Sequence, residues 1–327
     1  MKVIEAKGIS KYYTVKKRKN FFRSEKQVVC AVKDLNISIK EGEIVGLLGL
    51  NGAGKTTTIK MLSTLLNPTD GQITIDGFDA VKEAMKVKKH INMIAGGERM
   101  LYWRLTGSEN LRYFGKLYQL SGLELEKRIA YLLDQVGLKE AKDIPVELYS
   151  KGMKQRLQIA RGLINNPKYL FLDEPTLGLD APVAKQLRGL VKNLAKQENK
   201  GILLTSHYLE EVEELCDRIY IIEKGSIILD GTPEKIISSV VKSYHLRMET
   251  SSLSASAQNK LKQALVDCSI QFNWLTDSTV ILVDAPYDPT SFLINICMNE
   301  SVSILKLELK RPRLEDAILT LAKEKSA

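Results

Sequence analysis

The residues most able to do chemistry in this chain stand in a glycine-rich stretch. Residues 49–56 read Gly-Leu-Asn-Gly-Ala-Gly-Lys-Thr, which matches the pattern G-x-x-x-x-G-K-[S/T] at every fixed position. The glycines let the backbone turn its N–H groups inward around phosphate oxygens, at the positive end of the following helix. We expect Lys55 to reach the β- and γ-phosphates of a nucleotide and Thr56 to ligate Mg²⁺. The expected phosphate-binding set is Asn51, Gly52, Ala53, Gly54, Lys55, Thr56 and Thr57.

The sequence on either side gives this motif the context that it needs. Apolar residues 43–48 predict a buried strand, and residues 57–66 predict a helix that stops before Asn67 and Pro68. A glycine-rich turn that merely precedes a lysine is the alternative. The strand–loop–helix order disfavours that alternative.

A second group of candidate residues follows another apolar run. Residues 169–173 predict a strand that ends in Asp173 and is followed by Glu174. Sheets of this kind bind ligands at the carboxyl ends of their strands. Asp173 would hold Mg²⁺ through water, and Glu174 would polarise an attacking water. A solvated strand end is the alternative, and the phosphate-binding loop together with His207 argues against it.

The elements that must position these residues alternate between strands and helices. Residues 108–152 predict a helical insertion, with capping residues at 106–109 and a helix end near Gly137. Residues 81–89 predict a helix, and Pro182 begins another. Further strands are expected at residues 3–9, 28–39, 72–75, 91–94 and 202–206, and a hairpin at 219–230 around Lys224 and Gly225.

A chain of 327 residues suggests two domains. We place the boundary in the sequence Gly231-Thr232-Pro233, so that residues 1–232 form a nucleotide-binding domain and residues 233–327 a C-terminal accessory domain. The helical subdomain spans about residues 98–165 of the first. After a linking helix at 234–242, the second predicts a small βαββαβ sandwich. It holds no recognisable catalytic motif, and we interpret it as regulatory or dimer-stabilising.

The composition is ordinary for a globular protein, with 44% hydrophobic and 27% charged residues. No apolar run approaches the roughly 18 residues needed to span a bilayer, and the N-terminus lacks the apolar core of a signal peptide. We therefore expect no membrane-spanning segment. The four cysteines form no C-x-x-C pair and are interpreted as buried apolar residues in a reducing compartment.

The net charge of +9 is concentrated locally in residues 16–26, Lys-Lys-Arg-Lys-Asn-Phe-Phe-Arg-Ser-Glu-Lys. Such charge fits nucleic acid, an anionic membrane surface, or neither. A solvated loop is one interpretation of this segment. The other is a basic, aromatic tip that faces lipid headgroups or a membrane partner.

Together these features resemble the nucleotide-binding subunit of ABC transporters, over about residues 3–232. The diagnostic stretch is residues 149–156, Tyr-Ser-Lys-Gly-Met-Lys-Gln-Arg, which resembles the family signature Leu-Ser-Gly-Gly-Gln. A serine hydroxyl and glycine N–H groups at a helix start can bind a γ-phosphate, although a Ser-x-Gly alone is more often a helix cap. Ser150 and Gly152 match the signature, while Tyr149, Lys151, Met153 and Lys154 depart from it as in some exporters of drugs and other small molecules.

The resemblance implies a P-loop α/β fold of the ABC ATPase type with a helical subdomain, followed here by a small α+β domain. It also implies that two copies pair head to tail and sandwich two ATP molecules with Mg²⁺. Lys55 and Thr56 of one copy would then face Ser150 and Gly152 of the other. By the same resemblance, Asp180 would lie in the loop that links the two sites, His207 would contact the γ-phosphate and the attacking water, and Tyr13 would stack on adenine, with Tyr12 as a competitor.

One departure concerns the loop after the strand that ends near Ile94. The family usually has a glutamine there, which contacts Mg²⁺ and relays to the membrane domain. This chain places Gly97 at that position, and Glu98 could replace the missing ligand only if it faced the metal.

The resemblance implies an ATP-hydrolysing subunit that powers a separate membrane permease at the cytoplasmic face of the cell membrane. The C-terminal unit and residues 311–316 resemble exporter ATPases of the drug-resistance type, which implies a drug, antibiotic or other small molecule as cargo. A soluble relative that acts on DNA or ribosomes is the alternative. Such translation factors carry two ATPase units and this chain one, so no nucleic acid partner is expected. An inactive ATP-binding regulator is disfavoured by the intact Lys55, Asp173, Glu174 and His207.

Overall fold

The computed structural model describes residues 3–20, 23–95, 101–240, 244–275, 279–310 and 312–324, with the backbone alone for 16–20, 23–25 and 322–324. The chain divides into two compact units, Met1–Thr232 and Pro233–Ala327. No helix in these described ranges is both long and apolar enough to cross a membrane. Gly97 and Glu98 lie outside the described residues.

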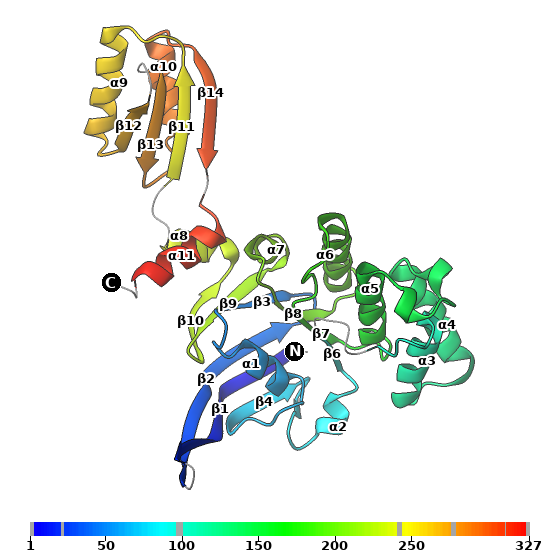
Figure 1. The fold of residues 1–327 in the computed structure, drawn as a ribbon. Helices are drawn as coiled ribbons and strands as arrows, with labels where there is room; N and C mark the ends of the chain where they lie inside the picture. Colours follow the sequence, from blue (N-terminus) through cyan, green and yellow to red (C-terminus); the bar gives the residue numbers. More distant parts are fainter. Residues whose placement is uncertain are drawn as a thin grey trace. The chain divides into compact units, whose positions relative to one another are not determined.

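The first unit is built on a six-stranded sheet with the order β10-β9-β3-β8-β7-β6 (Figure 1). Its five strands from β9 to β6 are parallel, and β10 pairs antiparallel with β9. Parallel strands are buried on both faces, which explains their continuous apolar runs. The strands are β3 (Ile44–Leu48), β6 (Ile91–Ala95), β7 (Tyr169–Asp173), β8 (Gly201–Thr205), β9 (Arg218–Glu223) and β10 (Ser226–Gly231).

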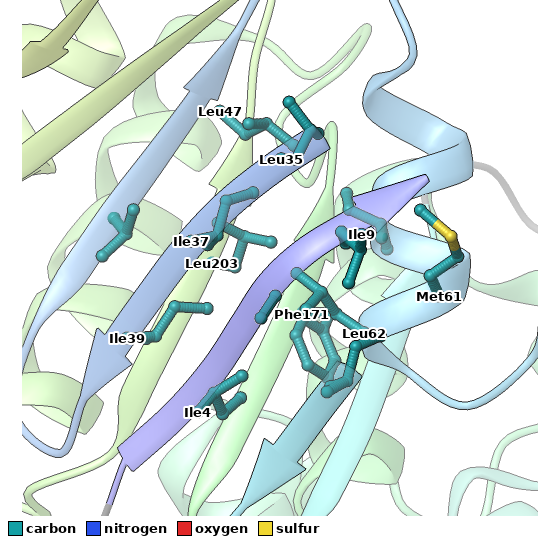
Figure 2. Packing of buried hydrophobic residues seen from close by; sticks show 14 of the residues in the cluster. Ile4, Ile9, Leu35, Ile37, Ile39, Leu47, Met61, Leu62, Phe171 and Leu203 are labelled. Carbon is teal, nitrogen blue, oxygen red and sulfur yellow. The ribbon is translucent and has the colours of Figure 1, made fainter. Parts of the chain in front are cut away.

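A second, antiparallel sheet packs over the first, with the order β2-β1-β4-β5. Between the two sheets lies a core to which the helix α1 (Lys55–Leu62) also contributes. Figure 2 shows Ile4 and Ile37 of the second sheet facing Phe171 and Leu203 of the first. The strands of the second sheet are β1 (Val3–Asn20), β2 (Arg23–Lys40), β4 (Asp70–Ile75) and β5 (Phe78–Asp79).

The loop expected at residues 16–26 is wrong for residues 16–20 and 23–26, which belong to the paired strands β1 and β2, while Phe21 and Phe22 lie outside the described residues. β4 pairs with β1 from Ile4 to Ser10, whereas β2 pairs with β1 from Val3 to Asn20. The β-branched and aromatic residues that flank the charged segment favour strands. Cys30 is exposed on this ribbon and Cys268 is half-buried, so the expected burial is confirmed only for Cys216 and Cys297.

The helical insertion consists of separate helices, and the capping box at its start is confirmed. The Thr106 hydroxyl accepts the Glu109 N–H at 3.2 Å, and the Glu109 carboxylate accepts the Thr106 N–H at 2.8 Å. Gly137 follows the second helix with a φ of 66°, as expected at a C′ position. The elements are α3 (Gly107–Leu117), α4 (Gly122–Gln135), the 3₁₀ turns η1 (Lys139–Ala141) and η2 (Val146–Leu148), and α5 (Lys151–Gly162).

The helix predicted at residues 81–89 is wrong in length, because α2 spans only Ala84–Val87. The Asp79 carboxylate accepts the N–H groups of Val81 and Lys82, each at 2.9 Å. Those two bonds hold a turn where the helix was expected to begin. The remaining helices of this unit are α6 (Ala181–Lys196), which has Pro182 in its first turn as predicted, and α7 (Leu209–Leu215).

The second unit contains the predicted βαββαβ order, which is confirmed. Its antiparallel sheet has the strand order β12-β13-β11-β14, the split βαβ arrangement, and its core includes Leu261 and Leu293 of two helices. Two further helices, α8 and α11, pack against each other. The elements are α8 (Pro233–Val240), β11 (Tyr244–Thr250), α9 (Ala255–Asp267), β12 (Gln271–Leu275), β13 (Val280–Ala285), α10 (Thr290–Asn299), β14 (Ile304–Lys310) and α11 (Leu314–Glu324).

Candidate functional site

The loop between β3 and α1 has two glycines at which a side chain would collide with neighbouring backbone. A Cβ on Gly49 would lie 2.3 Å from the Ile222 carbonyl oxygen, and one on Gly54 would lie 2.6 Å from that of Ala31. Gly54 also has a φ of 110°, which side chains rarely allow. The loop therefore packs closely against neighbouring backbone at these two positions, where the motif requires glycine.

Lys55 begins α1 and turns its side chain back over this loop. Its Nζ donates to the carbonyl oxygens of Gly49 at 2.5 Å and Leu50 at 3.2 Å. Burial lowers the pKa of the ammonium, and the nearby charges of Glu174 and Asp173 partly oppose that shift. The cation and both acids thus face one another at the carboxyl edge of the sheet.

The two acids are held by Thr205, a residue that the sequence analysis missed. Asp173 and Thr205 are neighbours at the ends of parallel β7 and β8. The Thr205 hydroxyl donates to Asp173 Oδ1 at 2.6 Å, and the Glu174 N–H donates to the Thr205 carbonyl at 3.0 Å. Glu174 has a φ of 52°, a conformation that non-glycine residues adopt at a cost and that clusters at active sites.

Glu174 and His207 are brought together, although they lie on different loops. The distance between His207 Nε2 and Glu174 Oε1 is 2.7 Å, and both side chains remain partly accessible to solvent. A carboxylate beside an imidazole can hold a water molecule and accept its proton. This pair is the part of the site best suited to hydrolysis.

Behind the pair lies a buried carboxyl group, Glu211 of α7, which the sequence analysis also missed. Glu211 is only 3% exposed, and its Oε2 accepts the hydroxyls of Thr176 at 2.8 Å and Ser206 at 2.5 Å. Thr176 belongs to the loop after β7, and Ser206 precedes His207. Glu211 therefore ties together the loops that carry the two residues of the pair.

Two residues, Thr56 and Asp173, are the predicted ligands of a magnesium ion. Thr56 is exposed in the first turn of α1, and Asp173 ends the strand β7. A hydroxyl and one carboxylate are the hard oxygen donors that Mg²⁺ accepts, since it keeps several waters and takes few protein ligands. The described residues contain no group of three or more His, Cys, Asp or Glu side chains that could hold a metal by themselves. The donor set fits a Mg²⁺ that is shared with a nucleotide.

The remaining predicted residues lie on other elements of the chain. Ser150 is the N-cap of α5, where its hydroxyl accepts the Met153 N–H at 3.2 Å, and a Cβ on Gly152 would lie 2.9 Å from the Val183 side chain. Asp180 is the exposed N-cap residue of α6. Tyr13 is exposed on the ribbon, with the Lys11 ammonium 5.8 Å from its ring centre.

Comparison with known proteins decides the family. The family model described as ABC transporter matches residues 32–177. The ABC transporter ATP-binding protein NatA of Bacillus subtilis (strain 168) is 45% identical over 218 residues, which covers 67% of this chain and 88% of NatA. The chain belongs to the ABC transporter ATP-binding proteins. Membership makes it an ATP-binding subunit and implies ATP hydrolysis.

Other ABC transporter proteins match this chain in sequence or in structure. The linearmycin resistance ATP-binding protein LnrL of Bacillus subtilis (strain 168) is 36% identical over 299 residues, covering 89% of this chain and 93% of LnrL. The daunorubicin/doxorubicin resistance ATP-binding protein DrrA of Streptomyces peucetius is 38% identical over 236 residues, covering 72% and 71% of the two chains.

Solved structures confirm the predicted fold of the first unit. A dimeric post-hydrolysis state of the ATP-binding cassette MJ0796, bound to ADP and Pi, superposes with a TM-score of 0.62 at 26% identity. The match covers 70% of this chain and 98% of the cassette. The ABC ATPase fold expected from the sequence motifs is therefore correct.

Proposed function

We propose that this ABC transporter protein is the ATP-hydrolysing subunit of an exporter whose membrane-spanning permease is a separate protein. Its cargo would be a drug, an antibiotic or another small molecule. The observation that carries this proposal is the similarity to the linearmycin resistance protein LnrL, because its 299 aligned residues extend beyond the first unit into the second.

The geometry of the site supports separate roles for its residues in binding phosphate, binding Mg²⁺ and activating water. The loop at residues 51–57 and Lys55 would hold the phosphates of ATP, with Thr56 and Asp173 as the protein ligands of Mg²⁺. Mg²⁺ neutralises charge that develops on the phosphates. Glu174 would accept a proton from the attacking water, and His207, 2.7 Å from Glu174, would keep that water in line.

A second copy of the chain would complete each site. Ser150 caps α5, whose first turn directs backbone N–H groups outward at the positive end of the helix. Ser150 and Gly152 of one copy would contact the phosphates held by Lys55 of the other, and Asp180 would connect the two sites. The dimeric MJ0796 cassette supports this head-to-tail arrangement.

The permease would dock on an aromatic corner of the helical part. Tyr102 and Trp103 are 47% and 49% exposed just before α3. The loop that presents them is fixed by fully buried Asn110, whose amide donates to the Tyr102 carbonyl at 2.9 Å and accepts the Tyr102 N–H at 2.8 Å. A rigid loop with exposed aromatic groups suits transmission of a closing motion to a membrane partner. That contact would hold the subunit at the cytoplasmic face of the cell membrane.

Action on DNA or ribosomes remains the alternative, and it is favoured by the net charge of +9 and by the basic residues 16–26. The face of the second unit's sheet that carries His245 and Arg247 does not offer the unpaired basic stripe that phosphate backbones require. Two cations and a histidine on this face each have an acidic partner. The pairs are His245–Asp284, Arg247–Glu249 and Lys306–Glu308.

Replacement of Glu174 tests the proposal. A strain that lacks this protein and its permease would be complemented with wild type or Glu174→Gln, and linearmycin and daunorubicin would serve as probe drugs. Wild type should restore resistance. Glu174→Gln should bind ATP but lose about a hundredfold or more of turnover and restore none, because an amide cannot accept the proton.

The matched control is Glu140→Gln, the same change at an exposed position of η1. It should behave as wild type. Near-normal hydrolysis in Glu174→Gln would reject Glu174 as the base. If wild type hydrolyses ATP but protects against neither drug, the cargo class is wrong and the ATPase assignment stands.

A further inference from the structure

The ribbon formed by β1 and β2 continues well beyond the sheet to which it belongs. β4 stops pairing with β1 at Ser10, and from there the two strands run on together to Asn20 and Arg23 (Figure 1). An isolated two-stranded ribbon is marginally stable in water, so one of this length needs a reason.

The side chains of residues 12–15 and 26–30 in this extension are exposed, including apolar ones. Val15 is 48% exposed on β1, and Val28 and Val29 are 65% and 43% exposed on β2. The register pairs Tyr13 with Val29, and Val15 is two residues further along β1, so these apolar residues share one face of the ribbon, while Val28 lies on the other. Exposed apolar side chains that lie together on a surface indicate a binding site for a partner.

Beyond these residues the ribbon becomes strongly basic. Residues 16–26 hold six cations and one acid, Glu25. Lys16 lies directly opposite Lys26 in the register, an arrangement of like charges that destabilises a strand pair. An anionic partner would remove that cost.

We propose that this ribbon, residues 11–20 and 23–32, binds the anionic headgroups of a lipid bilayer. The inference rests on the proposed function, which brings the subunit to a membrane through its permease. A bilayer surface supplies negative charge and an apolar layer beneath it, which match the basic end and the exposed valines respectively. A nucleic acid duplex supplies phosphates but keeps its apolar bases stacked, so it leaves Val15, Val28 and Val29 without a partner.

Vesicle binding by the purified full-length subunit, without permease, tests the proposal. Vesicles would contain about 30% phosphatidylserine or phosphatidylcholine alone, at about 0.02 M and about 0.5 M salt. The wild type should bind the anionic vesicles at low salt and not the neutral ones. The variant with Lys16, Lys17, Arg18 and Lys19 all changed to Ser should lose about tenfold or more of this binding, and keep its ATPase activity.

The chain offers a control of equal charge change. Lys82, Lys86, Lys88 and Lys89 are four exposed lysines on a segment of similar length, and their replacement by Ser should leave binding unchanged. Val15→Ser with Val29→Ser, two positions on the same face of the ribbon, should weaken binding at both salt concentrations, since apolar contacts are not screened.

Three results would overturn the proposal. The first is equal vesicle binding by wild type and the ribbon variant. The second is equal loss in the ribbon variant and in the Lys82 control. The third is ribbon-dependent binding to a short DNA duplex in the absence of any vesicle binding. Because vesicle binding is measured without permease or drug, these outcomes are distinct from failure of the exporter function.

Discussion

Removal of the Glu211 carboxyl group should damage both the stability and the activity of the first unit. Glu211 accepts the hydroxyls of Thr176 and Ser206, and all three side chains are buried. In Glu211→Ala both hydroxyls lose their acceptor in a site without solvent. A buried polar group without its partner costs about 1 to 3 kcal/mol. We expect the free energy of unfolding to fall by about 2 to 4 kcal/mol, since the Ser206 hydroxyl keeps only a weaker acceptor, the Tyr208 carbonyl oxygen at 3.5 Å.

Glu211→Gln separates the role of the hydrogen bonds from that of the side chain's acidity. The amide oxygen can accept both hydroxyls, as Oε2 does now. The amide nitrogen would replace Oε1, which is buried and has no hydrogen-bond partner among the described residues. The variant should therefore lose only about 1 kcal/mol, which is less than Glu211→Ala.

Urea unfolding in a Trp274→Phe background measures this directly. The chain has two tryptophans, so Trp103 then reports on the first unit alone. Turnover should fall more than the KM for ATP rises, because Thr176 leads to the loop of Asp180 and Ser206 precedes His207. If Glu211→Ala unfolds within about 0.5 kcal/mol of wild type, the hydrogen-bond argument is wrong. If Glu211→Ala lowers stability but leaves turnover unchanged, Glu211 does not position His207 for hydrolysis.

Two further changes test hydrogen bonds outside the cluster of Lys55, Asp173, Glu174 and His207. Tyr149→Phe removes the hydrogen bond that the Tyr149 hydroxyl donates to the Ala141 carbonyl at 2.6 Å, so the same urea assay should show a loss of about 1 kcal/mol with turnover retained. An unchanged midpoint would refute this role. Burial acts to raise the pKa of Asp76, but hydrogen bonds from Lys168 and Tyr169 outweigh it and hold the pKa below 3.8. A carboxyl group with a lowered pKa stabilises the fold above its unfolded pKa and less as pH falls, so Asp76→Asn should lose about 1 kcal/mol at pH 7, with the gap closing below about pH 4. A gap that is independent of pH would contradict that reasoning.

The sequence was most informative where one local pattern carries both structure and chemistry. The motif at residues 49–56 specifies a turn, a helix start and a cation together, and the turn has the two crowded glycines that it requires. Pro182 and the capping residues at 106–109 are local in the same way, because caps depend on neighbours a few residues apart.

The wrong or absent predictions share a different cause, because in each case the structure depends on contacts outside the local pattern. Charges in residues 16–26 indicated a loop, but pairing between β1 and β2 imposes a strand on both sides of the segment. The helix at 81–89 had suitable composition, and a single carboxylate, Asp79, redirected its first turn. Glu211 is one of four glutamates in residues 210–214, and only tertiary packing distinguishes it from the others by burying it.

Part of the site could still have been found from topology. Once β7 and β8 are adjacent and parallel, the residues that follow them must meet pair by pair. Asp173 lies beside Thr205, then Glu174 meets His207, and Thr176 meets Ser206 through Glu211. The sequence alone identified Asp173 and Glu174 at the end of β7, and it identified only His207 at the end of β8. The strand order makes the Thr205 hydroxyl an expected partner of Asp173, because the two residues end adjacent parallel strands. Adjacency of strand ends is thus the step that converts separate motifs into a single site.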